Sequence, residues 1–163
     1  MYLDAVRARL AALGFVSPAE MLPCSEREVE ILERHLGVTL PQAYKEYLLW
    51  IGHGAGRFER GTDCFYADVF DNRDGAEQLL SEDNFPQKLP EDAVVFSMHQ
   101  GYQFSFFRTS EGDDPPVYYY LEDSGQTGFR KTFPSFSNLL MTIVNSQHEF
   151  LVQQHMIQPS DSE

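Results

Sequence analysis

Basic residues, cysteines and long apolar runs are all scarce in this chain of 163 residues. Lys and Arg number 12 against 25 Asp and Glu, and the net charge of −13 repels nucleic-acid phosphates and anionic lipid. Two cysteines are too few for a disulfide framework in a chain that can build its own core. No apolar run approaches the roughly 20 residues of a bilayer-spanning helix. These shortages argue against nucleic-acid binding, a disulfide-stabilised secreted scaffold and a membrane-embedded protein.

The first residues, MYLDAVRARLAALGF, interleave charged and apolar side chains. This pattern predicts an amphipathic helix over Tyr2–Leu13 and differs from a signal peptide, in which the apolar region is continuous. Because cysteine is also scarce, we expect a protein of the reducing cytoplasm.

The remaining composition is that of a packed globular protein, with 42% hydrophobic and 13% aromatic residues. A chain of this length is large enough to bury a core of ordinary size in one domain. We expect that domain to cover residues 1–158, and we expect the polar residues 159–163 to form a frayed tail.

The most informative stretch is Ser25–Gly56, which predicts two short helices joined by a sharp turn. Ser25 and Glu28 have the spacing of a capping box at the start of the first helix. Its expected apolar face consists of Val29, Ile31, Leu32 and Leu36.

The joint and the second helix follow directly in the sequence. Gly37 suits the left-handed position after a helix, and Pro41 suits the first turn of the next helix. Gly52 is expected to end the second helix in the same left-handed way. The apolar face of this second helix is predicted to be Tyr44, Tyr47, Leu48 and Ile51.

Downstream of Gly56 the pattern changes to short extended segments. Aromatic and β-branched residues predict an extended segment at Phe65–Phe70. A short helix is predicted at Asp74–Leu80. A final helix is predicted at Ser135–Val144, and the following residues are expected to extend it. The predicted strands are Val94–Ser97, Gln103–Phe107 and Val117–Leu121. Strands grouped between helices indicate an α+β domain, with a mainly antiparallel sheet packed by N-terminal helices and a C-terminal helix.

In this unit a helix is followed by Leu-Gly, then by Leu-Pro, a tyrosine and a Gly-rich turn. This order of elements resembles that of the SMI1/KNR4 family of the SUKH superfamily. Where that family commonly has Asn-Gly after the second helix, this chain has Ile51-Gly52-His53-Gly54. For bacterial members the resemblance implies immunity proteins that bind and neutralise a cognate toxin, often a nuclease, whereas fungal relatives are linked to cell-wall regulation. The residues that carry the resemblance are Glu33, Leu36, Gly37, Leu40, Pro41, Tyr44, Tyr47, Leu48, Gly52 and Gly54.

Searches for a catalytic or metal-binding motif fail. The glycines of Gly52–Gly56 leave a helix instead of entering one, and no Gly-Lys-Ser/Thr follows them. Asp74-Gly75 lacks the other ligands of a calcium loop, and neither the histidines nor the cysteines have zinc-site spacing. We therefore assign no catalytic residue, no metal and no cofactor. The alternative is a small enzyme or ligand-binding domain whose pocket assembles only in the fold, around His53, His99 and nearby acids.

Negative charge is concentrated between Glu59 and Gln126, a segment that contains 15 acidic residues and four basic ones. Such a segment would steer a basic protein, for example a toxin, towards this part of the chain, although acidic surfaces also serve solubility alone. No nucleic acid or membrane is expected as a partner. The candidate partner contacts, chosen by charge, are Asp63, Asp68, Asp71, Asp74, Glu111, Asp113, Asp114, Glu122 and Asp123.

Overall fold

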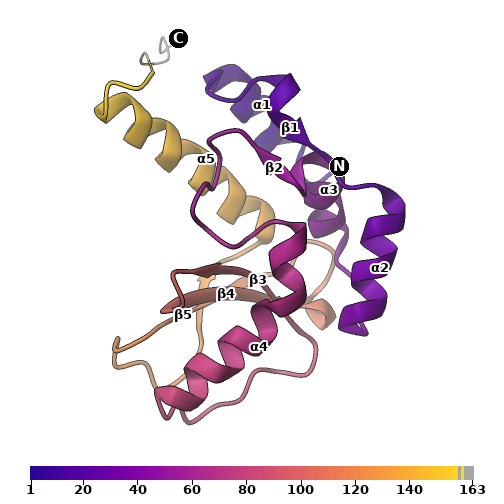
Figure 1. Ribbon diagram of the computed structural model, residues 1–163, viewed down its shortest axis with the longest axis vertical. Coiled ribbons are helices and arrows are strands. Elements are labelled where there is room, and N and C mark those ends of the chain that lie inside the picture. Colours follow the sequence, from indigo (N-terminus) through magenta and orange to yellow (C-terminus); the bar gives the residue numbers. More distant parts are fainter. Residues whose placement is uncertain (158, 160–163) are drawn as a thin grey trace.

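The larger of the two sheets in the computed structural model, which describes residues 1–157 and 159, is a four-stranded antiparallel sheet in the lower half of the view in Figure 1. Its strands follow one another in space as they do in sequence: β3 (Ala93–His99), β4 (Gln103–Arg108), β5 (Val117–Leu121) and β6 (Arg130–Phe133). A second, two-stranded antiparallel sheet pairs β1 (Met21–Leu22) with β2 (Gly54–Ala55). The predicted α+β class is confirmed. The predicted frayed tail lies outside the described residues except for Pro159.

The described residues form five α-helices, of which α4 makes the most extensive contact with the four-stranded sheet. α1 and α5, from opposite ends of the chain, lie side by side (Figure 1). Short 3-10 turns occur at Pro18–Glu20 and Thr109–Glu111. The helices are α1 (Asp4–Leu13), α2 (Glu26–Leu36), α3 (Gln42–Ile51), α4 (Tyr66–Glu82) and α5 (Phe136–Gln153).

The predicted two-helix unit is present as α2 and α3. The Ser25 hydroxyl accepts from the backbone N–H of Glu28, and the Glu28 carboxylate accepts from the backbone N–H of Ser25 at 2.8 Å. Gly37 adopts the left-handed conformation, with φ of 68°. The prediction for Ile31 was wrong: 39% of this residue is exposed, because α2 buries only the narrower stripe that contains Val29 and Leu32.

The prediction for Gly52 was also wrong. It ends α3 with φ of −58°, a right-handed conformation that any residue can adopt. Its missing side chain serves a close approach instead, because Gly52 is buried against Leu48 and Cys24.

Residues Tyr66–Phe70 are helical, not extended as predicted, and belong to the long helix α4 together with the predicted helix at Asp74–Leu80. Asp68 caps the helix start, since its carboxylate accepts from the backbone N–H of Phe65 at 3.0 Å. The aromatic residues of this segment favour a strand when taken alone. The segment is helical instead, because a helix buries one stripe of its side chains against the rest of the protein. The buried residues of this stripe are Val69, Asn72, Ala76, Leu79 and Leu80.

The sheet separates two hydrophobic clusters. One face packs with α1, α2, α3 and α5, and at its centre Tyr44 lies 5.1 Å from Phe107 and 5.4 Å from Phe136, measured between ring centroids. The other face packs with α4 and contains Phe104, Phe106 and Tyr120. Because both faces are covered, most aromatic side chains of the strands serve the core.

Candidate protein-binding surface

Three of the nine acidic residues chosen by charge have structural partners inside the fold. Asp68 caps α4, as described above. Asp114 accepts from the backbone N–H of Ser137 at 2.9 Å, at the start of α5. Glu111 accepts from the hydroxyl of Tyr118, also at 2.9 Å. Two of these three carboxylates thus stabilise helix starts, and the third holds the side chain of a strand residue.

Asp63 and Asp113 have exposed side chains, but they lie in separate connections. The main chain of Asp63 bridges to Met98 of β3 through two backbone hydrogen bonds. The carbonyl of Asp113 accepts from the backbone N–H of Ala43 at the start of α3. The structure therefore does not bring all nine residues together on one surface.

The remaining four residues do lie on neighbouring elements. Asp71 and Asp74 are exposed on the outer side of α4, and Glu122 and Asp123 are exposed in the β5–β6 turn. The end of α4 reaches this turn, because the Tyr120 hydroxyl donates to the carboxylate of Asp83. We define the acidic surface as Asp71, Asp74, Glu82, Asp83, Glu122 and Asp123.

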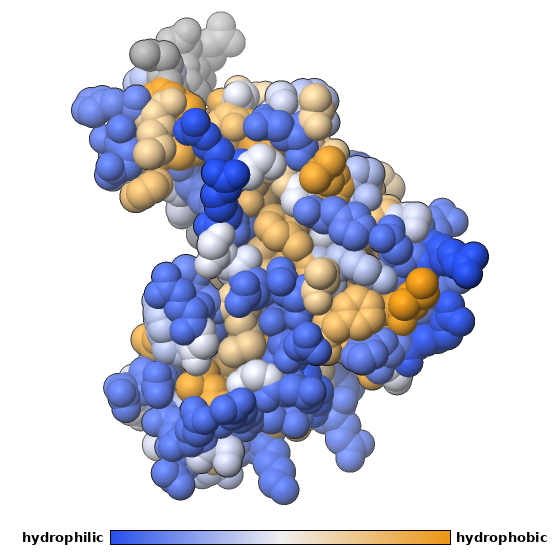
Figure 2. Space-filling model, in the orientation of Figure 1, coloured by the Kyte–Doolittle hydropathy of each residue, from blue (hydrophilic) through white to orange (hydrophobic). Residues whose placement is uncertain are grey.

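A shallow hollow of about 340 Å³ joins the end of α4 to the β5–β6 turn, with Asp83 and Asp123 both in its lining. Figure 2 shows hydrophilic residues over α4 in the lower part of the molecule. Burial, and then the hydrogen bond to Asp83, raise the pKa of Tyr120, so its hydroxyl remains a donor. Sequence reasoning did not include Glu82 and Asp83 because it ended this helix at Leu80.

None of the six carboxylates of the acidic surface forms an ion pair with another residue that the structure describes. By contrast, Glu77 on the same helix pairs with Arg73 at 2.9 Å, and Asp92 pairs with Arg108 at 2.9 Å. Two of the four basic residues between Glu59 and Gln126, Arg73 and Arg108, are thus engaged with other acids. The acidic surface keeps an uncompensated negative field.

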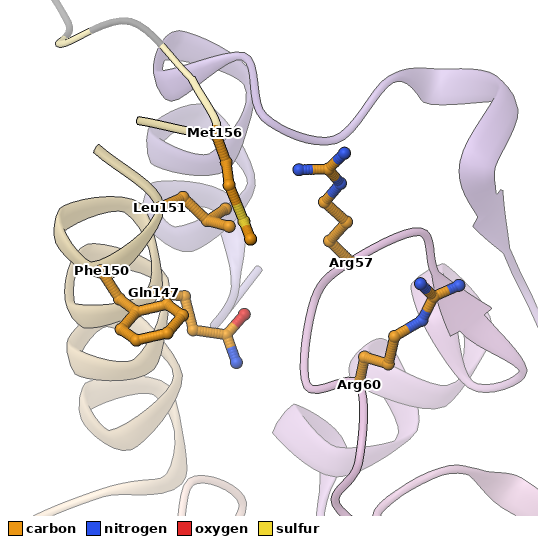
Figure 3. A pocket seen from close by; sticks show the side chains of 6 residues that line it. All are labelled: Arg57, Arg60, Gln147, Phe150, Leu151 and Met156. Atoms are coloured by element: carbon orange, nitrogen blue, oxygen red, sulfur yellow. The ribbon is translucent and has the colours of Figure 1, made fainter. Parts of the chain in front are cut away.

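A second surface has the opposite character. Arg57 and Arg60, from the loop between β2 and α4, face Phe150, Leu151 and Met156 across a groove of about 530 Å³ (Figure 3). Phe150 and Met156 are 58% and 57% exposed, so the groove is open and its apolar side is accessible. We call this surface the arginine groove. Its apolar wall belongs to α5 and the residues that follow it.

The alternative site around two histidines is not one pocket: His53 lines an open hollow of about 480 Å³, and His99 is not in its lining. His53 contacts Glu28 at 2.8 Å, whereas His99 lies 3.3 Å from the Thr62 hydroxyl and packs against Tyr102.

An internal cavity beside Glu59 and Cys64 has a volume of about 60 Å³, far below the roughly 300 Å³ of a typical ligand pocket. Burial raises the pKa of both the Glu59 carboxyl and the Cys64 thiol. The cavity is lined mostly by apolar side chains and has no room for a substrate of ordinary size.

Across the residues that the structure describes, we find no helix with the length and apolar character that a bilayer crossing demands. A capped α2–α3 unit, an antiparallel sheet and a closing helix define a small α+β domain without a ligand-sized internal pocket among the cavities described above.

The sequence model of the SMI1 / KNR4 family (SUKH-1) matches residues 23–142, and the chain belongs to this family. The match contains the whole acidic surface but only the arginine side of the arginine groove. No curated protein matches the chain.

Proposed function

We propose that this protein is a non-enzymatic binding module that neutralises a cognate protein toxin, in the manner of bacterial immunity proteins of its family. The observation that carries the proposal is the acidic surface, where six carboxylates from α4 and the β5–β6 turn lack ion-pair partners among the described residues. Such a surface attracts a basic protein and accelerates its encounter.

In the proposed mechanism this protein covers the substrate-binding groove of the toxin through complementary charge and shape. A toxin that acts on nucleic acid must present a basic groove to phosphates. Carboxylates of the acidic surface would occupy that groove in place of the phosphates and prevent substrate binding. This action needs no catalytic residue, cofactor or metal.

One further observation supports this proposal over the alternative of a small enzyme, and a second supports the compartment in which it would act. The acids and histidines that the sequence singled out lie apart or serve the fold, as in the case of Asp68, Asp114 and His99. The buried thiols of Cys24 and Cys64 are both unpaired, which supports action in the reducing cytoplasm.

The test is copurification of the tagged full chain with the product of the adjacent reading frame, because an immunity protein is expected beside its toxin. We expect a stable complex whose affinity falls as salt concentration rises, and loss of the toxin's activity in that complex. A neighbouring protein that does not bind, or one that stays active when bound, would overturn the proposal. Affinity indifferent to salt would overturn its electrostatic mechanism.

A further inference from the structure

Three potential metal ligands meet where the start of α2 contacts the end of α3. The Cys24 sulfur, a carboxylate oxygen of Glu28 and a ring nitrogen of His53 all lie within 4.8 Å of one another. Cys24 and Glu28 are four residues apart, and His53 follows α3. The capping box of α2 thus places a carboxylate beside a thiol and an imidazole.

The thiol of Cys24 packs at the edge of the hydrophobic core. The residue is only 5% exposed, and no hydrogen bond of its sulfur to another described residue is found. The sulfur occupies a space that exists because residue 52 is glycine, since a Cβ there would lie 2.4 Å from it. Apart from this packing, no interaction engages the sulfur beside the ion pair of Glu28 and His53.

Backbone hydrogen bonds fix the main chain at Cys24 and His53 before any metal binds. The N–H of Cys24 donates to the carbonyl of Leu48 at 2.9 Å, and the N–H of His53 donates to the carbonyl of Leu22 at 2.8 Å. The ring of Tyr66 packs edge-on against the imidazole of His53, with 5.3 Å between ring centroids. Fixed backbone positions of this kind lower the cost of ordering when a metal binds.

We propose that Cys24, Glu28 and His53 form a binding site for a divalent transition metal, of which zinc is the expected ion. Thiolate, imidazole and carboxylate are the three side-chain ligands that zinc takes in proteins. Water supplies the fourth ligand, because Glu28 and His53 are 33% and 38% exposed at the side chain and solvent reaches the site.

Bound zinc would require a small rearrangement. The Glu28 carboxylate and the His53 ring nitrogen are 2.8 Å apart, whereas ligand atoms around tetrahedral zinc lie roughly 3.3 to 3.8 Å apart, as follows from metal–ligand bonds of about 2.0 to 2.3 Å. Rotation of the exposed His53 side chain is sufficient to open this contact. The other oxygen of Glu28 stays on the backbone N–H of Ser25, so the cap of α2 survives.

The thiol must lose its proton when the metal binds. Burial raises the pKa of Cys24 to about 12 in the metal-free protein. A coordinated thiol is deprotonated outright, so binding should release protons and weaken as the pH falls.

The experiment is calorimetric titration of the metal-free full chain with zinc, followed by cobalt absorption spectroscopy. We expect one zinc per chain, proton release, and a sulfur-to-cobalt charge-transfer band in the near ultraviolet. Cys24→Ser and His53→Gln should each weaken zinc binding at least tenfold and remove or shift that band. His53 is exposed, so His53→Gln should fold even if Cys24→Ser does not.

Two matched controls use the other cysteine and another histidine. Cys64→Ser and His99→Gln should bind zinc with unchanged affinity, because Cys64 and His99 lie outside the cluster. Absence of zinc binding by the wild-type chain would overturn the proposal. Binding that survives His53→Gln, or a cobalt spectrum without sulfur ligation, would equally overturn it.

Discussion

The sulfur of Cys24 occupies the place where a side chain at position 52 would begin. A Cβ on Gly52 would lie 2.4 Å from Sγ, closer than any real contact between such atoms. This contact joins the residue before the N-cap of α2 to the last turn of α3. A Cβ would also lie 2.5 Å from the backbone carbonyl oxygen of Leu48, so the glycine is required by these two neighbours and not by a left-handed backbone conformation.

Gly52→Ala should destabilise the protein by about 1 to 3 kcal/mol, because the methyl group overpacks the contact with Cys24. Urea unfolding of the two proteins measures the difference. Gly128→Ala is the control, since its nearest neighbours are side-chain atoms of Gln87 at 3.4 Å, which can move. Equal stability of Gly52→Ala and the wild type would contradict this account of the contact.

Ser25→Ala should destabilise the protein by about 1 kcal/mol, because the backbone N–H of Glu28 loses its acceptor. The free energy of unfolding in urea is again the measurement. Ser81→Ala, at an exposed position of α4, removes a hydroxyl outside any cap and should change stability little. A Ser25 variant as stable as the Ser81 variant would show that the box does not stabilise α2.

Glu59→Gln should stabilise the protein at neutral pH. Burial raises the pKa of the Glu59 carboxyl above its ordinary value of 4.5, although the hydrogen bond from Gln147 opposes this. The folded state then holds the proton more tightly than the unfolded state, so stability falls as pH rises through the interval above 4.5. The neighbouring Tyr47 and Cys64 stay neutral over this range, since burial also raises their pKa values.

Thermal unfolding of wild type and Glu59→Gln between pH 4 and pH 8 measures this effect. The stability difference should be largest at neutral pH and should shrink towards acid pH. Glu30→Gln, on the exposed side of α2, controls for loss of one negative charge. A difference independent of pH would be inconsistent with a buried, protonatable Glu59.

Local signals predicted the parts of the fold that depend on neighbours in sequence. The capping box of Ser25 and Glu28 and the left-handed Gly37 need only the first helix itself, and both are confirmed. Gly52 was assigned the wrong conformation because its real constraint, Cys24, is 28 positions away in the sequence. The helical start of α4 was missed because its aromatic residues favour strands when taken alone.

The candidate contacts show the same limit. Charge alone cannot separate Asp114, which accepts from the backbone N–H of Ser137, from Asp74, which is exposed. Both are aspartates in an acidic segment, and only the fold shows which has an internal partner. The edge strand β6 was missed for a related reason, because Arg130–Phe133 is mostly exposed and lacks an apolar alternation.

The central claim is that the partner binds at the acidic surface. The most direct test measures the affinity of the copurified partner for two matched double variants. Asp71→Asn/Asp74→Asn removes two exposed charges from α4, and Glu26→Gln/Glu30→Gln removes two from α2. The α4 variant should bind about tenfold more weakly at low salt, chiefly through slower association, and the α2 variant should bind as the wild type does. Equal affinities, or loss of binding only when Arg57 and Arg60 are replaced, would contradict the assignment and point to the arginine groove.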